Sequence, residues 1–269
     1  MKGFVSFCLT LALTTAIAHG AEPPHSNVFY QSGNLKIEAY LFKPSGDGPF
    51  PVIVYNHGSR EGHERQEVTF AYIAEVFVPA GYAVLVPERR GYGRSDGTPF
   101  SEAVRNDVGP RFVARMQDET GDVLAAVDYL ETLSFINPHR IAIAGWSLGG
   151  IVTIFAVSRS DAFAAAIDQA GGALTWNHSS ALRSAMIEAV AHAHPPILLM
   201  VAENDRTTES ITTLDRVLTE HGLPHEAKIY PPFHPASHGS TPDGHRIFSR
   251  AGVSVWSGDA LNYVDRYLN

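Results

Sequence analysis

The chain has 269 residues, of which 45% are hydrophobic and 18% are charged, and it contains 23 Gly and 17 Pro. These proportions are typical of an ordinary globular domain and exclude a disordered, collagen-like or coiled-coil chain. The formal net charge is −8, from 20 Lys and Arg against 28 Asp and Glu. Because a phosphate backbone is bound by basic surfaces, this charge argues against nucleic acid as a partner.

Residues 1–21 have the pattern of a signal peptide. Lys2 precedes an apolar stretch from Phe4 to Ala18, and small residues up to Ala21 follow it. This stretch is shorter than the roughly 20 apolar residues of a membrane-spanning helix. The pattern therefore favours cleaved export over a membrane anchor, with Ala18 or Ala21 as the last residue removed. We expect a periplasmic or secreted protein with no membrane association after cleavage.

The mature chain is expected to work without a thiol or a metal. Cys8, the only cysteine, lies within the signal segment, so thiolate catalysis and zinc–thiolate sites are excluded. The closest histidine spacings are His192 with His194 and His234 with His238. Prolines adjoin both pairs and no H-E-x-x-H motif is present, so we expect no metal site.

Residues 22–269 alternate between strand and helix patterns, which predicts a single α/β domain. Short β-branched runs predict strands at Leu35–Phe42, Pro51–Tyr55, Tyr82–Val86, Arg140–Ala144, Ala164–Ile167, Ile197–Val201 and Ala227–Tyr230. Apolar spacings of three and four predict helices at Glu64–Val78, Asp118–Leu133, Leu148–Val157, Ala181–Ala191, Thr208–His221 and Gly258–Leu268. Several strands are apolar throughout, which indicates a mainly parallel sheet covered on both faces. The first two strands are expected to pair as an antiparallel edge.

The most informative stretch surrounds Ser147. An apolar strand runs into Gly145-Trp146-Ser147-Leu148-Gly149, and an apolar helix follows directly. The motif G-x-S-x-G is weak evidence alone, but this strand-turn-helix context is the one a nucleophile elbow requires. Ser147 is therefore predicted to be a nucleophile, and the N–H of Leu148, at the helix start, is predicted to face a developing oxyanion.

A serine nucleophile needs a base and an acid, which in this type of elbow follow in the order Ser, acid, His. Asp205 comes just after an apolar strand and is the predicted acid, with Glu203 as the alternative. Three histidines lie in the loop after the last predicted strand. His245, at the end of that loop, is the predicted base, and His238 is the alternative.

The turn after the strand Pro51–Tyr55 is expected to complete the oxyanion hole. It reads Asn56-His57-Gly58-Ser59-Arg60, and an N–H of Ser59 or Arg60 could join that of Leu148. His57 is interpreted as a structural histidine that supports the turn. A later glycine-rich stretch, Arg90-Gly91-Tyr92-Gly93-Arg94-Ser95, lacks the G-x-G-x-x-G spacing of a nucleotide loop. It is interpreted as a tight turn with Arg89 or Arg90 in an ion pair.

From about Leu35 to the C-terminus, these motifs in this order resemble the α/β-hydrolase superfamily, especially its dienelactone-hydrolase-like and prolyl-oligopeptidase-like branch. The resemblance implies Ser147 as nucleophile, Asp205 as acid and His245 as base, in a mainly parallel sheet flanked by helices with a small cap or none. The better-known dienelactone hydrolases have a similar site in which the nucleophile is a cysteine. Serine at this position favours ordinary ester hydrolysis.

The implied enzyme is an exported serine hydrolase that cleaves small or medium carboxylic esters through an acyl-enzyme, without a cofactor. Trp146 and Trp176 are candidates for an apolar substrate pocket. Two other functions remain open: a scaffold that only binds a small molecule or partner, since fold does not imply function, and an amidase or peptidase of the prolyl-oligopeptidase kind. The sequence leaves the oligomeric state and the physiological ester open.

Overall fold

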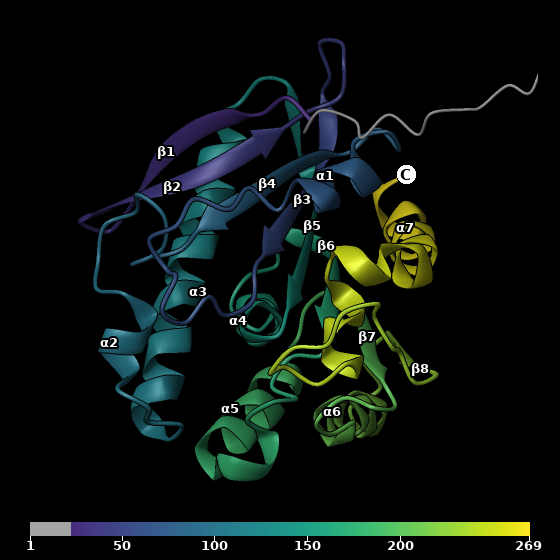
Figure 1. Ribbon diagram of the computed structural model, residues 1–269. Coiled ribbons are helices and arrows are strands. Elements are labelled where there is room, and N and C mark those ends of the chain that lie inside the picture. The colour runs from purple at the N-terminus through teal and green to yellow at the C-terminus, as the bar shows by residue number, and fades with distance from the viewer. Residues whose placement is uncertain (1–22) are drawn as a thin grey trace, which may run out of the picture.

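The computed structural model describes residues 23–269, in which eight strands form one sheet in the order β1-β2-β4-β3-β5-β6-β7-β8 (Figure 1). The strands from β4 to β8 across this order run parallel to one another, whereas β2 is antiparallel to both β1 and β4. The strands are β1 (Ser26–Ser32), β2 (Leu35–Phe42), β3 (Phe50–Asn56), β4 (Ala83–Glu88), β5 (Ile136–Trp146), β6 (Phe163–Gln169), β7 (Ile197–Ala202) and β8 (His225–Tyr230). The mainly parallel sheet predicted from the sequence is confirmed.

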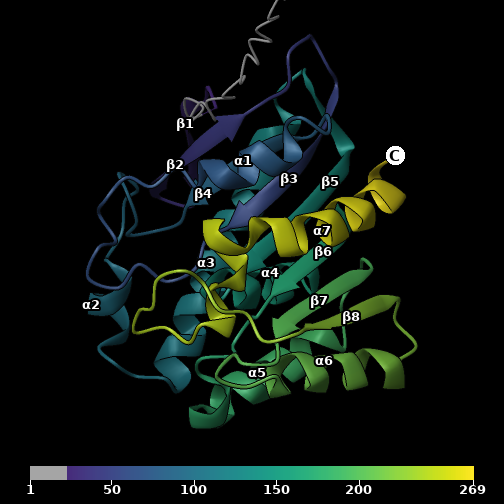
Figure 2. The same ribbon diagram turned by 45° about the vertical axis from the view of Figure 1, so that its right-hand side comes forward.

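Helices cover both faces of the sheet. On one face lie α1 (Ala71–Phe77) and α7 (Val253–Leu268), which contact each other (Figure 2). On the other face lie α3 (Pro110–Glu131), α4 (Leu148–Val157), α5 (Ser180–Val190) and α6 (Glu209–Glu220). Every residue of α4 is buried because this helix packs between the sheet, α3 and α5. Its uniformly apolar sequence reflects that central position.

One strand and one α-helix were not predicted, and another helix is much shorter than expected. Strand β1 and the short helix α2 (Phe100–Val104) have no counterpart among the predicted elements. The predicted helix Glu64–Val78 is helical only over α1, Ala71–Phe77. The Glu64 carboxylate accepts a hydrogen bond from the N–H of Ser101 at 2.9 Å, and Arg65 donates to the carbonyls of Ser95 and Gly97. These tertiary contacts hold the segment before α1 against residues 93–101, in turns and not in a helix.

The predicted antiparallel pairing of the first two expected strands is wrong. In the structure β2 pairs with β1 and β4, and β3 lies beyond β4 and is parallel to it. The connection from β2 to β3 therefore does not form a hairpin, and the chain then crosses over through α1 from β3 to β4. The antiparallel edge exists, but β1 and β2 form it.

The predicted signal peptide, residues 1–21, lies outside the described residues. Over residues 23–269, no helix combines the length and the apolar character that crossing a membrane requires.

The six parallel strands place their following loops at one edge of the sheet. β3, β4, β5, β6, β7 and β8 all end there, because parallel strands share a carboxyl edge. In open α/β sheets this edge is where ligands bind. The loops that follow these strands carry every predicted catalytic residue.

Candidate active site

Ser147 stands in a sharp turn between β5 and α4. Its backbone has φ 60° and ψ −116°, a strained conformation for a residue with a side chain. A Cβ on Gly145 would overlap the carbonyl of Gly149, and a Cβ on Gly149 would overlap the carbonyl of Asn56. The N–H of Ser147 donates to the carbonyl of Gln169 at 2.9 Å, which ties the turn to β6. The glycines of the motif are therefore required by close backbone packing.

Asp205 and His245 are brought together at the same edge of the sheet. Nδ1 of His245 donates to Oδ2 of Asp205 at 2.8 Å, and the two side chains are 2% and 0% exposed. Gly244 permits this contact because a Cβ there would overlap the backbone of Asn204 and Asp205. The side chain of Asn204 also exchanges hydrogen bonds of 2.8 and 2.9 Å with the backbone of Phe233, at the start of the histidine loop.

The second ring nitrogen of His245, Nε2, is buried and has no hydrogen-bond partner among the described residues. His245 and Ser147 line the same cavity. Nε1 of Trp146 donates to the carbonyl of His245 at 3.1 Å, and the two rings are 5.6 Å apart. Trp146, expected only as a pocket residue, therefore also fixes the histidine beside the elbow.

The alternative residues lie elsewhere. Nδ1 of His238 is 3.0 Å from Oδ2 of Asp243, and its side chain is 79% exposed. His234 is also largely exposed and lies 3.5 Å from the same carboxylate. Glu203 is exposed. Of the candidates, the structure brings only His245 and Asp205 into contact with each other.

The loop after β3 passes close to the elbow. A Cβ on Gly58 would lie 3.3 Å from the Cβ of Ser147, and Ser59 lines both cavities that contain Ser147. Leu148 is the first residue of α4, so its N–H has no partner within the helix. Ser59 and Leu148 therefore both line a cavity that contains Ser147, and their role as oxyanion donors stays a prediction.

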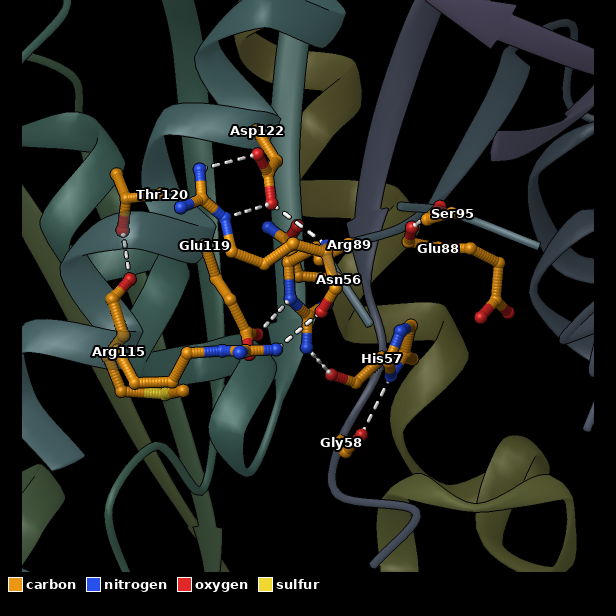
Figure 3. A network of polar contacts seen from close by, with 12 residues as sticks. Asn56, His57, Gly58, Glu88, Arg89, Ser95, Arg115, Glu119, Thr120 and Asp122 are labelled. Atoms are coloured by element: carbon orange, nitrogen blue, oxygen red, sulfur yellow. Dashed lines mark hydrogen bonds and ion pairs between the residues drawn. The ribbon is translucent and has the colours of Figure 1, made fainter. Parts of the chain in front are cut away.

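A buried ion network holds this loop in place (Figure 3). Nη2 of Arg89 donates to the carbonyl of His57 at 2.9 Å, and Nε pairs with Glu119 at 2.7 Å. Glu119 also pairs with Arg115 at 2.7 Å. The ring of His57 is buried and stacks on Phe70, with centroids 5.3 Å apart. Burial and the nearby Arg89 charge lower the pKa of His57 well below its usual value, which fits a neutral, structural histidine.

The predicted ion pairs of the glycine-rich turn are present for both arginines. Arg89 pairs with Glu119, and Arg90 pairs with Asp122 at 2.9 Å. Arg60, which follows Ser59, pairs with the buried carboxylate of Glu88. Burial raises the pKa of Glu88 to about 7, against the opposing effect of Arg60.

Two cavities meet at Ser147. Both also include Ser59 and Leu174 in their linings. The apolar cavity, about 370 Å³, has walls that include Phe100, Val104, Val108, Phe112, Leu148 and Ile151. The polar cavity, about 350 Å³, has walls that include Trp146, Ser240, Thr241, His245, Arg246 and Ser249.

Most of the residues that form the wall of the apolar cavity were not predicted from the sequence. Helix α2 and the segment before α3 form much of this wall, and neither was predicted to line the site. The prediction that Trp176 lines a substrate pocket is wrong. Trp176 is 2% exposed, packs beside Gly172, and lines neither cavity. The short helix η1 (Trp176–His178) turns its ring into the core.

Within residues 23–269, no group of three His, Cys, Asp or Glu side chains is arranged to hold a metal ion.

Asp168 is a buried carboxyl directly beneath the elbow. Its Oδ1 accepts from the N–H of Gly171 at 2.7 Å, whereas Oδ2 has no partner among the described residues. Gly150, in the first turn of α4, is so close that a Cβ there would overlap Oδ1. Burial raises the pKa of Asp168 to about 7.

The raised pKa of Asp168 predicts a loss of stability as pH rises. Between about pH 4 and 7 the folded state holds this proton and the unfolded state does not, so the free energy of unfolding falls across that window. Asp168→Asn removes the charge, and at pH 8 we expect it to be about 4 kcal/mol more stable than the parent. At pH 4 the two should be nearly equal. Urea unfolding at both pH values measures this.

The exposed residue Asp161 provides the control. Asp161→Asn should leave the difference from the parent the same at pH 4 and pH 8. Equal stability of Asp168→Asn and the parent at pH 8 would show that the buried carboxyl is not destabilising there.

The arrangement of strands, helices and elbow is that of an α/β hydrolase. The structure is similar to an acylaminoacyl peptidase from Pyrococcus horikoshii, with a TM-score of 0.69, 20% sequence identity, and coverage of 91% of this chain and 41% of the other. It is also similar to a dienelactone hydrolase from Anabaena variabilis, with a TM-score of 0.66, 20% identity, and coverage of 93% and 100%. The predicted fold is therefore confirmed.

The chain belongs to the dienelactone hydrolase family, whose model matches residues 37–251. Among curated proteins, it is similar to the quorum-quenching protein AidA of Acinetobacter baumannii, with 33% identity over 143 residues. That alignment covers 53% of this chain and 42% of AidA. The match thus spans less than half the length of that relative. The chain is therefore related to hydrolases.

Proposed function

We propose that this protein is an exported serine hydrolase that cleaves carboxylic esters of small or medium size through Ser147, His245 and Asp205. One observation carries the proposal. The buried His245–Asp205 pair leaves Nε2 of His245 without a partner, and that histidine lines the same cavity as Ser147 in its strained turn. A base held by an acid beside a serine is the arrangement that activates a hydroxyl.

The proposed reaction is acyl transfer to Ser147. Nε2 of His245 takes the hydroxyl proton while Oγ of Ser147 attacks the ester carbonyl carbon, and Asp205 stabilises the imidazolium. The N–H groups of Leu148 and Ser59 donate to the oxyanion. His245 then protonates the leaving alcohol, and water releases the acid from the acyl-enzyme by the same steps in reverse. This chemistry needs no cofactor.

The substrate is proposed to be a small-molecule ester, and a peptidase is the second candidate. The similarity to an acylaminoacyl peptidase favours that alternative. An ester needs less help in expelling its leaving group than an amide does. The signal-peptide pattern of residues 1–21 supports export to the periplasm or beyond.

Matched substrates distinguish the candidates. The mature chain is assayed on p-nitrophenyl butyrate and on butyryl p-nitroanilide, which differ only in the scissile bond. We expect a burst of about one nitrophenol per active site, followed by steady turnover of the ester, and no measurable anilide cleavage. Anilide cleavage at a similar rate would favour the peptidase. Turnover of neither compound would favour the binding-only scaffold.

A further inference from the structure

We propose that the apolar cavity binds the uncharged, aliphatic acyl part of the ester and that the polar cavity receives the alcohol part. This inference rests on the proposed function and names its substrate class: esters of neutral aliphatic acids. The positions of the two cavities relative to Ser147 and His245 support it, and so does the chemistry of their walls.

The position of His245 fixes the direction of the ester. In acyl transfer the histidine that deprotonates the serine later protonates the leaving group, so the leaving oxygen must lie on the histidine side. His245 lines the polar cavity, together with Arg246 and Thr241. The wall of the apolar cavity, as the described residues define it, does not include His245. The alcohol therefore leaves through the polar cavity, and the acyl chain extends into the apolar one.

The walls of the apolar cavity favour an aliphatic chain. Phe100 and Val104 of α2, Phe112 of α3 and Ile151 of α4 all face it. Its volume of about 370 Å³ lies at the small end of the range for ligand pockets. Each methylene that moves from water into such a wall contributes about a fourfold gain in binding.

The charged residues at this cavity disfavour an acidic acyl group. Of its described lining residues, only Glu61 and Asp107 are charged, and both are carboxylates. Asp107 is held in place because its carboxylate accepts from the N–H groups of Gly109 and Arg111 at 2.8 and 3.0 Å. A carboxylate at the far end of an acyl chain would meet like charge without a cation to pair with.

The test measures acyl-chain preference in the mature chain. We expect kcat/KM to rise on the order of a hundredfold from p-nitrophenyl acetate to hexanoate, from four added methylenes. The mono-p-nitrophenyl ester of adipic acid has the same six-carbon chain with a terminal carboxylate. We expect its kcat/KM to be at least about tenfold below that of the hexanoate, as for a pocket that rejects one misplaced group.

Two matched tryptophan variants separate the cavities. Val108 and Thr241 are both half-buried, and each lines only one of them. Val108→Trp should lower the hexanoate-to-acetate ratio of kcat/KM at least about tenfold, whereas Thr241→Trp should leave this ratio unchanged. Thr241→Trp should instead lower the ratio for hexyl butyrate against ethyl butyrate. Phe112→Ala provides a second test of the wall, because a larger cavity should raise the octanoate-to-hexanoate ratio.

The outcomes separate this inference from the proposed function. An unchanged hexanoate-to-acetate ratio in Val108→Trp and an unchanged octanoate-to-hexanoate ratio in Phe112→Ala would overturn the assignment of the cavities. A hexanoate-to-acetate ratio that falls in Thr241→Trp and is unchanged in Val108→Trp would reverse the assignment of the cavities. Equal rates for the adipate and hexanoate esters would overturn the charge argument. In each case ester turnover that depends on Ser147 would leave the proposed function standing, whereas its absence would remove both.

Discussion

Replacement of Ser147 by alanine is expected to lower kcat for ester hydrolysis by at least about 10⁴-fold, with the fold intact. The variant removes the hydroxyl that forms the acyl-enzyme but leaves the backbone of the elbow. Its N–H can still donate to Gln169, as in the parent. The oxyanion donors also remain, so a small residual rate above that in water is expected.

The measurement is steady-state hydrolysis of p-nitrophenyl butyrate by the parent and by Ser147→Ala. Circular dichroism and urea unfolding check that the variant is folded. A folded variant that keeps the parent rate would show that another group performs the reaction.

The second large effect is expected at His245. His245→Ala should lower kcat by about 10⁴-fold or more, because triad members act as a unit and the loss of the base alone disables the nucleophile. His238→Ala is the matched control, since it changes the same residue type in the same loop. His238 is 79% exposed and contacts Asp243, away from Asp205, so its loss should alter kcat by no more than about twofold.

These two variants decide between the histidines that the sequence left open. Both are assayed at pH 8 on the same ester. An active His245→Ala beside an inactive His238→Ala would contradict the assignment of the base.

Much of the sheet and the elbow could be predicted because their signals are local. The run into Gly145, the serine and the apolar helix after it lie within one short stretch, and α4 was predicted with its observed bounds, Leu148–Val157. The uniformly apolar strands predicted a sheet covered on both faces, and the structure confirms it. Here local pattern and tertiary packing agree.

The pairing of strands and the choice of histidine depend on distant contacts. Strands β2 and β3 follow each other in the sequence, but β4 lies between them in the sheet. The order of the strands along the chain did not indicate this. Among the histidines of one loop, only His245 follows a glycine that packs against the backbone of Asp205. The Asp243-Gly244-His245 stretch carried this signal, but its meaning depended on the position of the loop after β7.

The walls of the apolar cavity had the weakest sequence signal. Arg105 and Asn106 adopt φ angles of 51° and 62°, which non-glycine residues seldom take, and they turn the chain between α2 and α3. Helix α2 has only five residues, too few for a periodic pattern. The residues that we propose to bind the acyl chain therefore lie in the segment that local rules describe least well.

The anchoring of the oxyanion loop also could not be predicted. Arg89 and Glu119 are 30 positions apart, and their buried pair holds the carbonyl of His57. The sequence indicated an ion pair near this turn but gave no reason to connect it with the loop after β3.

Mass spectrometry after labelling with a fluorophosphonate shows directly whether Ser147 is an activated nucleophile. The probe reacts with a serine hydroxyl only when a neighbouring base activates it, and the mature chain is treated beside Ser147→Ala. If Ser147 is the activated nucleophile, we expect one adduct per chain, located on Ser147 by peptide mapping, and none on the variant. A folded parent chain without an adduct, or an adduct retained by Ser147→Ala, would overturn this assignment.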